Sequence, residues 1–146
     1  MTFPDPVAGL VIRYSYLWHS EKKAGATEGA KDRPAAIVMK RVRSEGQNPL
    51  VFVVPVTHTE PKPPVVGVPI PPKVAKHLGL DNIPQWVIVS EVNYFDWPGY
   101  DLRTDPKTGQ YDYGMMPREF FEVIAAEFKK LLEGRNVMSS NRNDEA

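Results

Sequence analysis

The chain contains no cysteine and only three histidines among its 146 residues. Without cysteine no disulfide framework can form, and the few histidines, with no dense carboxylate cluster, argue against a structural zinc site. We therefore expect a cytoplasmic protein that carries no metal.

Long apolar runs are also missing. No run approaches the length that a bilayer requires, and the N-terminus lacks a charged segment leading into an apolar stretch. The sequence thus predicts neither secretion nor membrane spanning. The formal net charge is zero, whereas proteins that hold long nucleic acid by overall electrostatic attraction are usually strongly basic. We therefore expect any phosphate site to depend on a few well-positioned donors and not on the overall charge of the protein.

What the chain does have is enough apolar residues for one core. With 146 residues, of which 42% are hydrophobic, it is long enough for one ordinary domain and not comfortably for two. We assign residues 1–134 to this domain. Residues 135–146 are polar with little to bury, which predicts a disordered tail.

Runs of branched and aromatic residues predict the strands. They lie at 10–18, 35–42, 50–56, 65–70 and 86–92. The fourth run is flanked by prolines, so we expect it only at a sheet edge. Between the first two runs, residues 19–32 are polar and predict a mobile loop. The run at 86–92 leads into an aromatic loop at 93–99.

Two helices are predicted. A short one covers residues 73–78, with Pro72 in its first turn and Gly79 ending it. A longer one starts at Pro117 and ends at Gly134, and its apolar positions fall on one face. They are Phe120, Phe121, Ile124, Phe128, Leu131 and Leu132. Several non-alternating strands, proline-rich connections and one closing helix predict a mainly β, α+β fold, a small barrel with helical additions.

Functional groups stand at the ends of two predicted strands. Arg33 and Pro34 come directly before one apolar run, and Thr57 and His58 directly follow another. Arginine presents a planar fork of donors that matches phosphate oxygens, so these groups at neighbouring strand ends suggest a phosphate pocket. The alternative for Arg33 is a surface arginine that pairs with Asp32 or another carboxylate.

These residues resemble the MazF/PemK family of bacterial toxins. The resemblance rests on the first strand led by Gly9, a long loop, Arg33-Pro34 opening an apolar strand, and Val53-Val54-Pro55-Val56-Thr57 closing the third. It implies an SH3-like barrel and a metal-independent endoribonuclease that cleaves single-stranded RNA. Arg33 and Thr57 match the family's catalytic arginine and threonine. The resemblance also implies a homodimer and a small antitoxin whose extended tail fills the RNA groove.

The residues agree with this chemistry. Attack by an RNA 2′-hydroxyl on its neighbouring phosphate needs a proton acceptor, a proton donor and positive charge at the phosphorus. Arg33 can supply the charge, and Thr57 can bind a nonbridging oxygen. His58 and His19 are the candidates for proton transfer. Because adjacent strand residues face opposite ways, His58 joins Thr57 only if the strand breaks at 59–61.

Further residues are candidates for binding RNA. Lys31 precedes Arg33 in the loop, while Tyr94 and Trp97 could stack on bases or could equally plug the barrel. Glu91 lies either buried near Arg33 or along the groove. A second reading of the whole chain is an inactive barrel that serves as a protein-interaction module. A third is a nucleic-acid binder that does not cleave.

Overall fold

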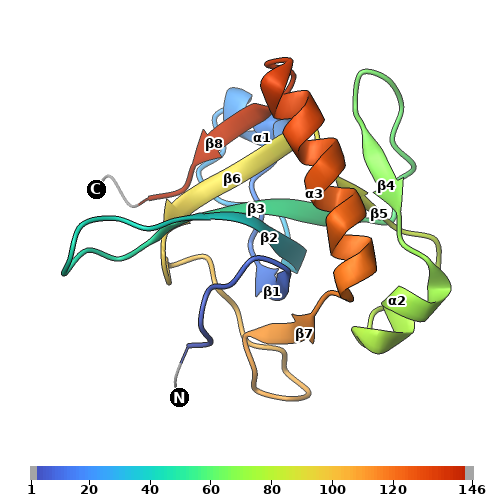
Figure 1. The fold of residues 1–146 in the computed structure, drawn as a ribbon, viewed down its shortest axis with the longest axis horizontal. Helices are drawn as coiled ribbons and strands as arrows, with labels where there is room; N and C mark the ends of the chain where they lie inside the picture. The colour runs from blue at the N-terminus through green and yellow to red at the C-terminus, as the bar shows by residue number, and fades with distance from the viewer. Residues whose placement is uncertain (1–2, 144–146) are drawn as a thin grey trace.

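The structure of the protein, a computed structural model, describes residues 3–143. The chain runs through its strands and helices in the order shown by colour in Figure 1. The strands are β1 (Leu10–Tyr14), β2 (Arg33–Arg41), β3 (Leu50–Thr57), β4 (Gly67–Pro69), β5 (Trp86–Ile88), β6 (Glu91–Asp96), β7 (Asp112–Met115) and β8 (Met138–Asn141). The helices are α1 (His19–Lys23), α2 (Pro72–His77) and α3 (Arg118–Glu133).

The sheet is mainly antiparallel. Its strands follow the order β4-β5-β3-β2-β1-β7, and β6 pairs with both β3 and β8. One edge of β3 serves two partners, because Leu50 to Val53 pair with β6 whereas Val56 and Thr57 pair with β5. The expected α+β class is confirmed. Closure of the strands into an SH3-like barrel stays a prediction.

Strand alternation sends side chains into two cores on opposite faces of the sheet. On one face Val11, Ala36 and Val54 pack with the apolar side of α3, which lies across the strands in Figure 1. On the other face Ile12 and Ile37 join an aromatic cluster. Its aromatic members are Tyr14, Tyr16, Phe95 and Trp97. The central strands are therefore buried on both sides.

Some element boundaries differ from the prediction. The first strand ends at Tyr14, and the expected loop at 19–32 contains the short helix α1. Its start is fixed by Glu21, whose Oε1 accepts a hydrogen bond from the Trp18 main-chain N–H at 3.0 Å. The predicted strand at 86–92 is split into β5 and β6, and β6 continues into the segment expected to be an aromatic loop.

Both helical predictions, the short helix and the longer one, are confirmed. Pro72 begins α2, and Gly79 follows it with φ +68, a backbone conformation that glycine adopts without penalty. Gly134 follows the end of α3. Within residues 3–143, none of the helices combines the length and apolar character needed to cross a membrane.

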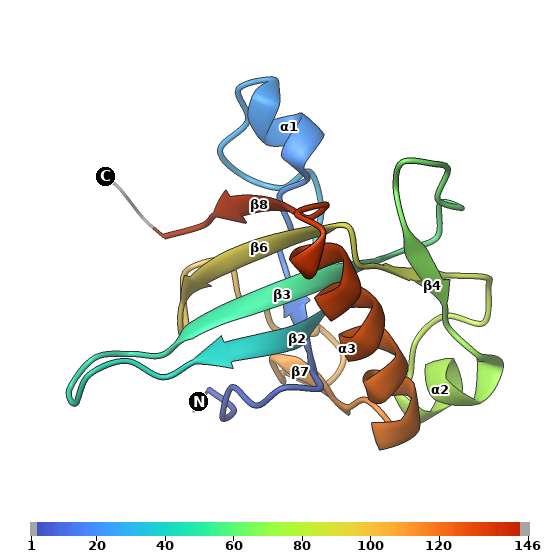
Figure 2. The ribbon, with the colours of Figure 1, turned by 45° about the horizontal axis from the view of Figure 1, so that its top comes forward.

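The C-terminal segment corrects the prediction of a disordered tail at 135–146. Met138–Asn141 forms β8, which runs parallel to β6. Arg142 behind it is buried and pairs with Asp101, Nη2 to Oδ1, at 3.0 Å. The polar composition was misleading because this strand is fixed by main-chain pairing and by one buried ion pair. Residues 144–146 lie outside the described residues. Figure 2 shows β8 beside β6, and the β2–β3 hairpin reaching away from the rest of the fold.

Candidate active site

The register of the central strands brings Arg33 and Thr57 together. In the β2–β3 pair, Ala35 is opposite Pro55, so Arg33 and Thr57 lie at the same end of the two strands. Tyr14 of β1 lies opposite Arg33 on the other side. Antiparallel pairing of β2 and β3 thus brings two residues that are distant in sequence to the same end of the sheet.

Two cavities meet at these residues. One has a volume of about 550 Å³ and extends toward β1, β7 and the segment after α2. The other, of about 630 Å³, extends toward Trp18 and the proline-rich segment after β3. Four residues line both cavities: Lys31, Arg33, Thr57 and His58. We call the two cavities together the groove, and three of the predicted catalytic residues, Arg33, Thr57 and His58, border both of them.

The Arg33 guanidinium is stacked but is not neutralised. Its central carbon lies 5.0 Å from the centroid of the Trp18 ring, and its buried Nε has no hydrogen-bond partner. The alternative, an ion pair of Arg33 with Asp32 or another carboxylate, is not observed among the described residues, and Asp32 contacts Arg13 at 3.9 Å and Arg103 at 3.7 Å instead. Burial lowers the pKa of Arg33, while nearby Glu21 opposes this shift.

Thr57 ends its strand in a turn. Its Oγ1 accepts a hydrogen bond from the main-chain N–H of Thr59 at 3.1 Å, and β3 stops at Thr57. Strand alternation therefore no longer applies to His58, and both side chains line the two cavities. The end of the strand, which His58 needs in order to join Thr57, is therefore observed.

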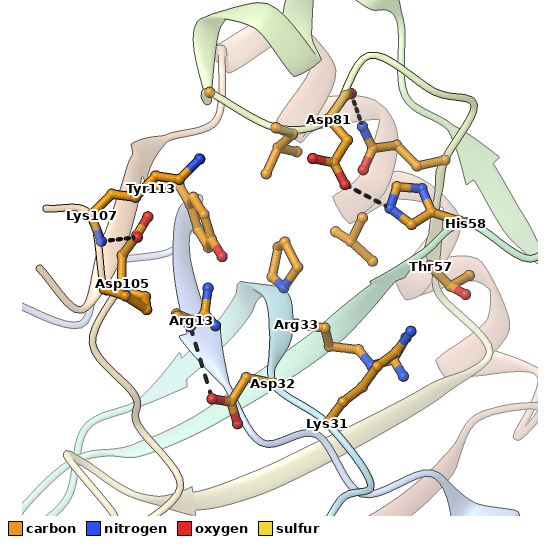
Figure 3. Close-up of a pocket in the computed structure, with 16 residues that line it drawn as sticks. Arg13, Lys31, Asp32, Arg33, Thr57, His58, Asp81, Asp105, Lys107 and Tyr113 are labelled. Atoms are coloured by element: carbon orange, nitrogen blue, oxygen red, sulfur yellow. Dashed lines mark hydrogen bonds and ion pairs between the residues drawn. The ribbon is translucent and has the colours of Figure 1, made fainter.

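His58 is held by the segment that follows α2. Its Nε2 lies 3.1 Å from Oδ2 of Asp81, and its Nδ1 lies 3.4 Å from the carbonyl oxygen of Pro84. Both partner atoms are acceptors, so each ring nitrogen that carries a proton has an acceptor within reach. Figure 3 shows this pair at one side of the first cavity.

The structure does not bring His19 to either cavity. It lies in α1, and its main-chain N–H donates to Oε2 of Glu91 at 2.8 Å. Glu91 is itself buried, and this burial raises its pKa, while the hydrogen bond from His19 lowers it. Of the two alternatives for Glu91, the buried one is therefore observed, and it anchors α1.

Tyr94 and Trp97 lie away from the groove. Trp97 is only 7% exposed and stacks on Phe95, with ring centroids 6.2 Å apart. Tyr94 is half-buried and stacks on Phe52 at 5.5 Å. Neither ring lines the two cavities, so base stacking by these residues does not fit the structure. Trp97 is instead buried in the aromatic cluster, and whether it plugs a barrel stays a prediction.

Several groove residues were missed by the sequence reasoning. Trp18 closes one cavity, whereas Arg13, Asp81, Lys107 and Tyr113 line the other. Only Trp18 could have been found from its neighbours in the sequence, because it is an aromatic residue at the end of an apolar run. The others come from separate segments, which chain folding alone brings together.

The groove is suited to an anion. Lys31, exposed at its centre, adds a second cation beside Arg33, and Thr57 adds a hydroxyl. Guanidinium and hydroxyl donors are the groups that bind phosphate oxygens. Within the described part of the chain, no three His, Asp or Glu side chains gather as a metal-binding group.

Comparisons with models of known protein families, with curated proteins and with solved structures each found no match.

Proposed function

We propose that this protein is an endoribonuclease of the MazF/PemK type that cleaves single-stranded RNA without a metal. One observation carries the proposal. The half-buried Arg33 guanidinium makes no ion pair with the described residues, its Nε has no hydrogen-bond partner, and it lies beside Thr57 and lines both cavities. A phosphodiester in the groove would supply the missing anion, with the chain on either side of it running into the two cavities.

The residues divide the chemistry among them. The 2′-hydroxyl gives its proton to a water molecule as its oxygen forms a bond to phosphorus, and the bond from phosphorus to the 5′-oxygen breaks. The 5′-oxygen then takes up a proton, so the products are a 2′,3′-cyclic phosphate and a 5′-hydroxyl. Arg33 stabilises the negative charge that develops on the phosphorane oxygens. Because Thr57 Oγ1 already accepts a bond from Thr59, its hydroxyl proton is free to be donated to a nonbridging oxygen.

Proton transfer is assigned to His58. Histidine is the side chain suited to exchange protons near neutral pH, and His58 lines both cavities whereas His19 lines neither. Asp81 fixes the ring through its contact with Nε2. With Asp81 holding Nε2, the proton that reaches the leaving 5′-oxygen is the one on Nδ1, which exchanges its long 3.4 Å contact with the Pro84 carbonyl for the substrate.

The family resemblance extends the proposal beyond the single chain. It implies an SH3-like barrel, a cytoplasmic homodimer and a small antitoxin whose extended tail occupies the same groove. A cationic groove is suited to such a competitor as well as to RNA. Antitoxin binding would then exclude the substrate directly.

The test is cleavage in EDTA. Purified protein free of any partner is incubated with long single-stranded RNAs that together cover all short motifs, and new 5′ ends are mapped. We expect discrete cuts that carry 5′-hydroxyls and that disappear when the nucleotide supplying the 2′-hydroxyl is changed to deoxy. Folded protein that leaves every RNA intact would reject the nuclease and leave the protein-interaction module.

A further inference from the structure

The first cavity extends from Arg33 to a second arginine. Arg13 lies in β1 opposite Pro34, and its side chain is 28% exposed. Its Nε is buried and has no hydrogen-bond partner, and its contact with Asp32 is long, at 3.9 Å. Asp32 is also shared with Arg103 at 3.7 Å. Within the chain, Arg13 thus has a long contact with Asp32 and a hydrogen bond to Tyr113 that lowers the pKa of the Tyr113 hydroxyl.

An aromatic ring and a lysine accompany Arg13. Tyr113 of β7 is half-buried beside it, and Lys107 lies in the loop before β7. Figure 3 shows Arg13, Tyr113 and Lys107 across the cavity from His58 and Asp81. A ring offers a stacking surface for a base, and cations bind the phosphate.

The carboxylates of the cavity are already occupied. Asp81 contacts His58 at 3.1 Å, Asp32 lies between its two arginines, and Oδ1 of Asp105 accepts the main-chain N–H of Lys107 at 2.8 Å. By contrast, the side chains of Lys31, Arg33 and Lys107 form no ion pair with the described residues. Among the described residues, the cavity thus has three cationic side chains without an ion pair and one such carboxylate, that of Asp105, which accepts a main-chain N–H.

We propose that this cavity is a nucleotide subsite: it holds the nucleotide next to the scissile phosphodiester, with that nucleotide's outer phosphate on Arg13 and Lys107 and its base or ribose against Tyr113. The inference rests on the proposed function and deepens it by naming a substrate-binding side of the groove. The volume of about 550 Å³ falls within the range of roughly 300–1,000 Å³ that is usual for small-ligand sites.

The experiment uses an RNA whose cut site has been mapped, made uncleavable by a 2′-deoxy nucleotide at that site. Affinity is measured by fluorescence anisotropy as a function of salt, for the full RNA and for two versions, each truncated at the cut phosphate on one side. The variants are Arg13→Gln, Lys107→Gln and Tyr113→Leu. Lys130→Gln, on the exposed face of α3, is the matched control.

We expect Arg13→Gln and Lys107→Gln each to lower the salt slope for the full RNA by about 0.7, the value for one lost phosphate contact on a single strand. Tyr113→Leu should weaken binding about fivefold or more, the lower end of the effect of losing one stacked base. On the RNA truncated at the side that occupies this cavity, all three variants should bind like the wild type. Lys130→Gln should match the wild type throughout.

The failures are distinguishable. If the wild type binds and cuts RNA while Lys107→Gln and Arg13→Gln keep its affinity and salt slope, the subsite is wrong and the nuclease stands. Equal losses on the full RNA and on both truncated RNAs would also reject the subsite, because the cations would then act on the groove as a whole. If the wild type neither binds nor cuts any RNA, both proposals fail. Lys107 is exposed, so its variant remains informative even if Arg13→Gln does not fold.

Discussion

The guanidinium of Arg33 lies over the indole ring of Trp18, with its central carbon 5.0 Å from the ring centroid. Trp18 is fixed in turn by Glu21, whose Oε1 accepts its main-chain N–H and whose Oε2 accepts that of Ala30 at 3.2 Å. Glu21 thus connects the start of α1 to the loop that follows it and fixes the Trp18 ring. We infer that the orientation of the Arg33 donors depends on this ring.

Trp18→Leu should slow RNA cleavage by about two- to thirtyfold. The loss corresponds to a cation–π contact of roughly 0.5–2 kcal/mol, and it arises because Arg33 would no longer be held against the ring. Single-turnover rate constants measure it. Trp18→Phe should recover much of the activity, whereas equal rates for wild type and Trp18→Leu would contradict the positioning role.

His58→Gln should reduce the cleavage rate constant by about 10²–10⁴-fold while RNA affinity stays close to that of the wild type, because proton transfer is lost and the cations remain. Asp81→Asn should have a smaller effect, since it removes the contact that orients the ring at 3.1 Å. His77→Gln is the control, because His77 is exposed on α2 and lines neither cavity. A fully active His58→Gln variant would reject the assignment.

Arg142→Ala should lower the free energy of unfolding by about 3–5 kcal/mol, as expected when one partner of a buried ion pair is removed. Its Nη2 pairs with Asp101 at 3.0 Å, and its Nη1 donates to the carbonyl of Thr27 at 2.8 Å. Urea denaturation measures the loss, with exposed Arg135→Ala as control. Faster proteolysis near Thr27 should accompany it. A stability change below about 1 kcal/mol would show that the pair does not fix the C-terminal strand.

Glu91 should make stability depend on pH. Burial raises its pKa above the ordinary value of 4.5, so the native state binds the proton more tightly than the unfolded state. Its contribution to stability is then fully present below pH 4.5 and is lost as pH rises through the raised native value. Urea denaturation from pH 4 to 7 should show the wild type losing stability relative to Glu91→Gln over this window. A parallel pH course for both proteins would contradict the burial effect.

Local sequence was enough to place Arg33 and Thr57 because each adjoins an apolar run that must become a buried strand. It was not enough for Arg13, Asp81 or Tyr113, which reach the groove only through the pairing of β1 with β2 and β7 and through the segment after α2. Trp97 was ambiguous because one ring can stack on a base or fill a core. The strand β8 was missed because its stability comes from main-chain pairing and from Asp101, which is distant in sequence.

The central claim is that the Arg33 charge promotes cleavage of the phosphodiester. The most direct measurement is the single-turnover cleavage rate constant in EDTA for the wild type, Arg33→Ala and the exposed control Lys130→Ala. The account predicts that Arg33→Ala loses about 10²–10³-fold, as expected when a donor to a developing oxyanion is removed, while Lys130→Ala cleaves like the wild type. Cleavage by Arg33→Ala at the wild-type rate would contradict the account.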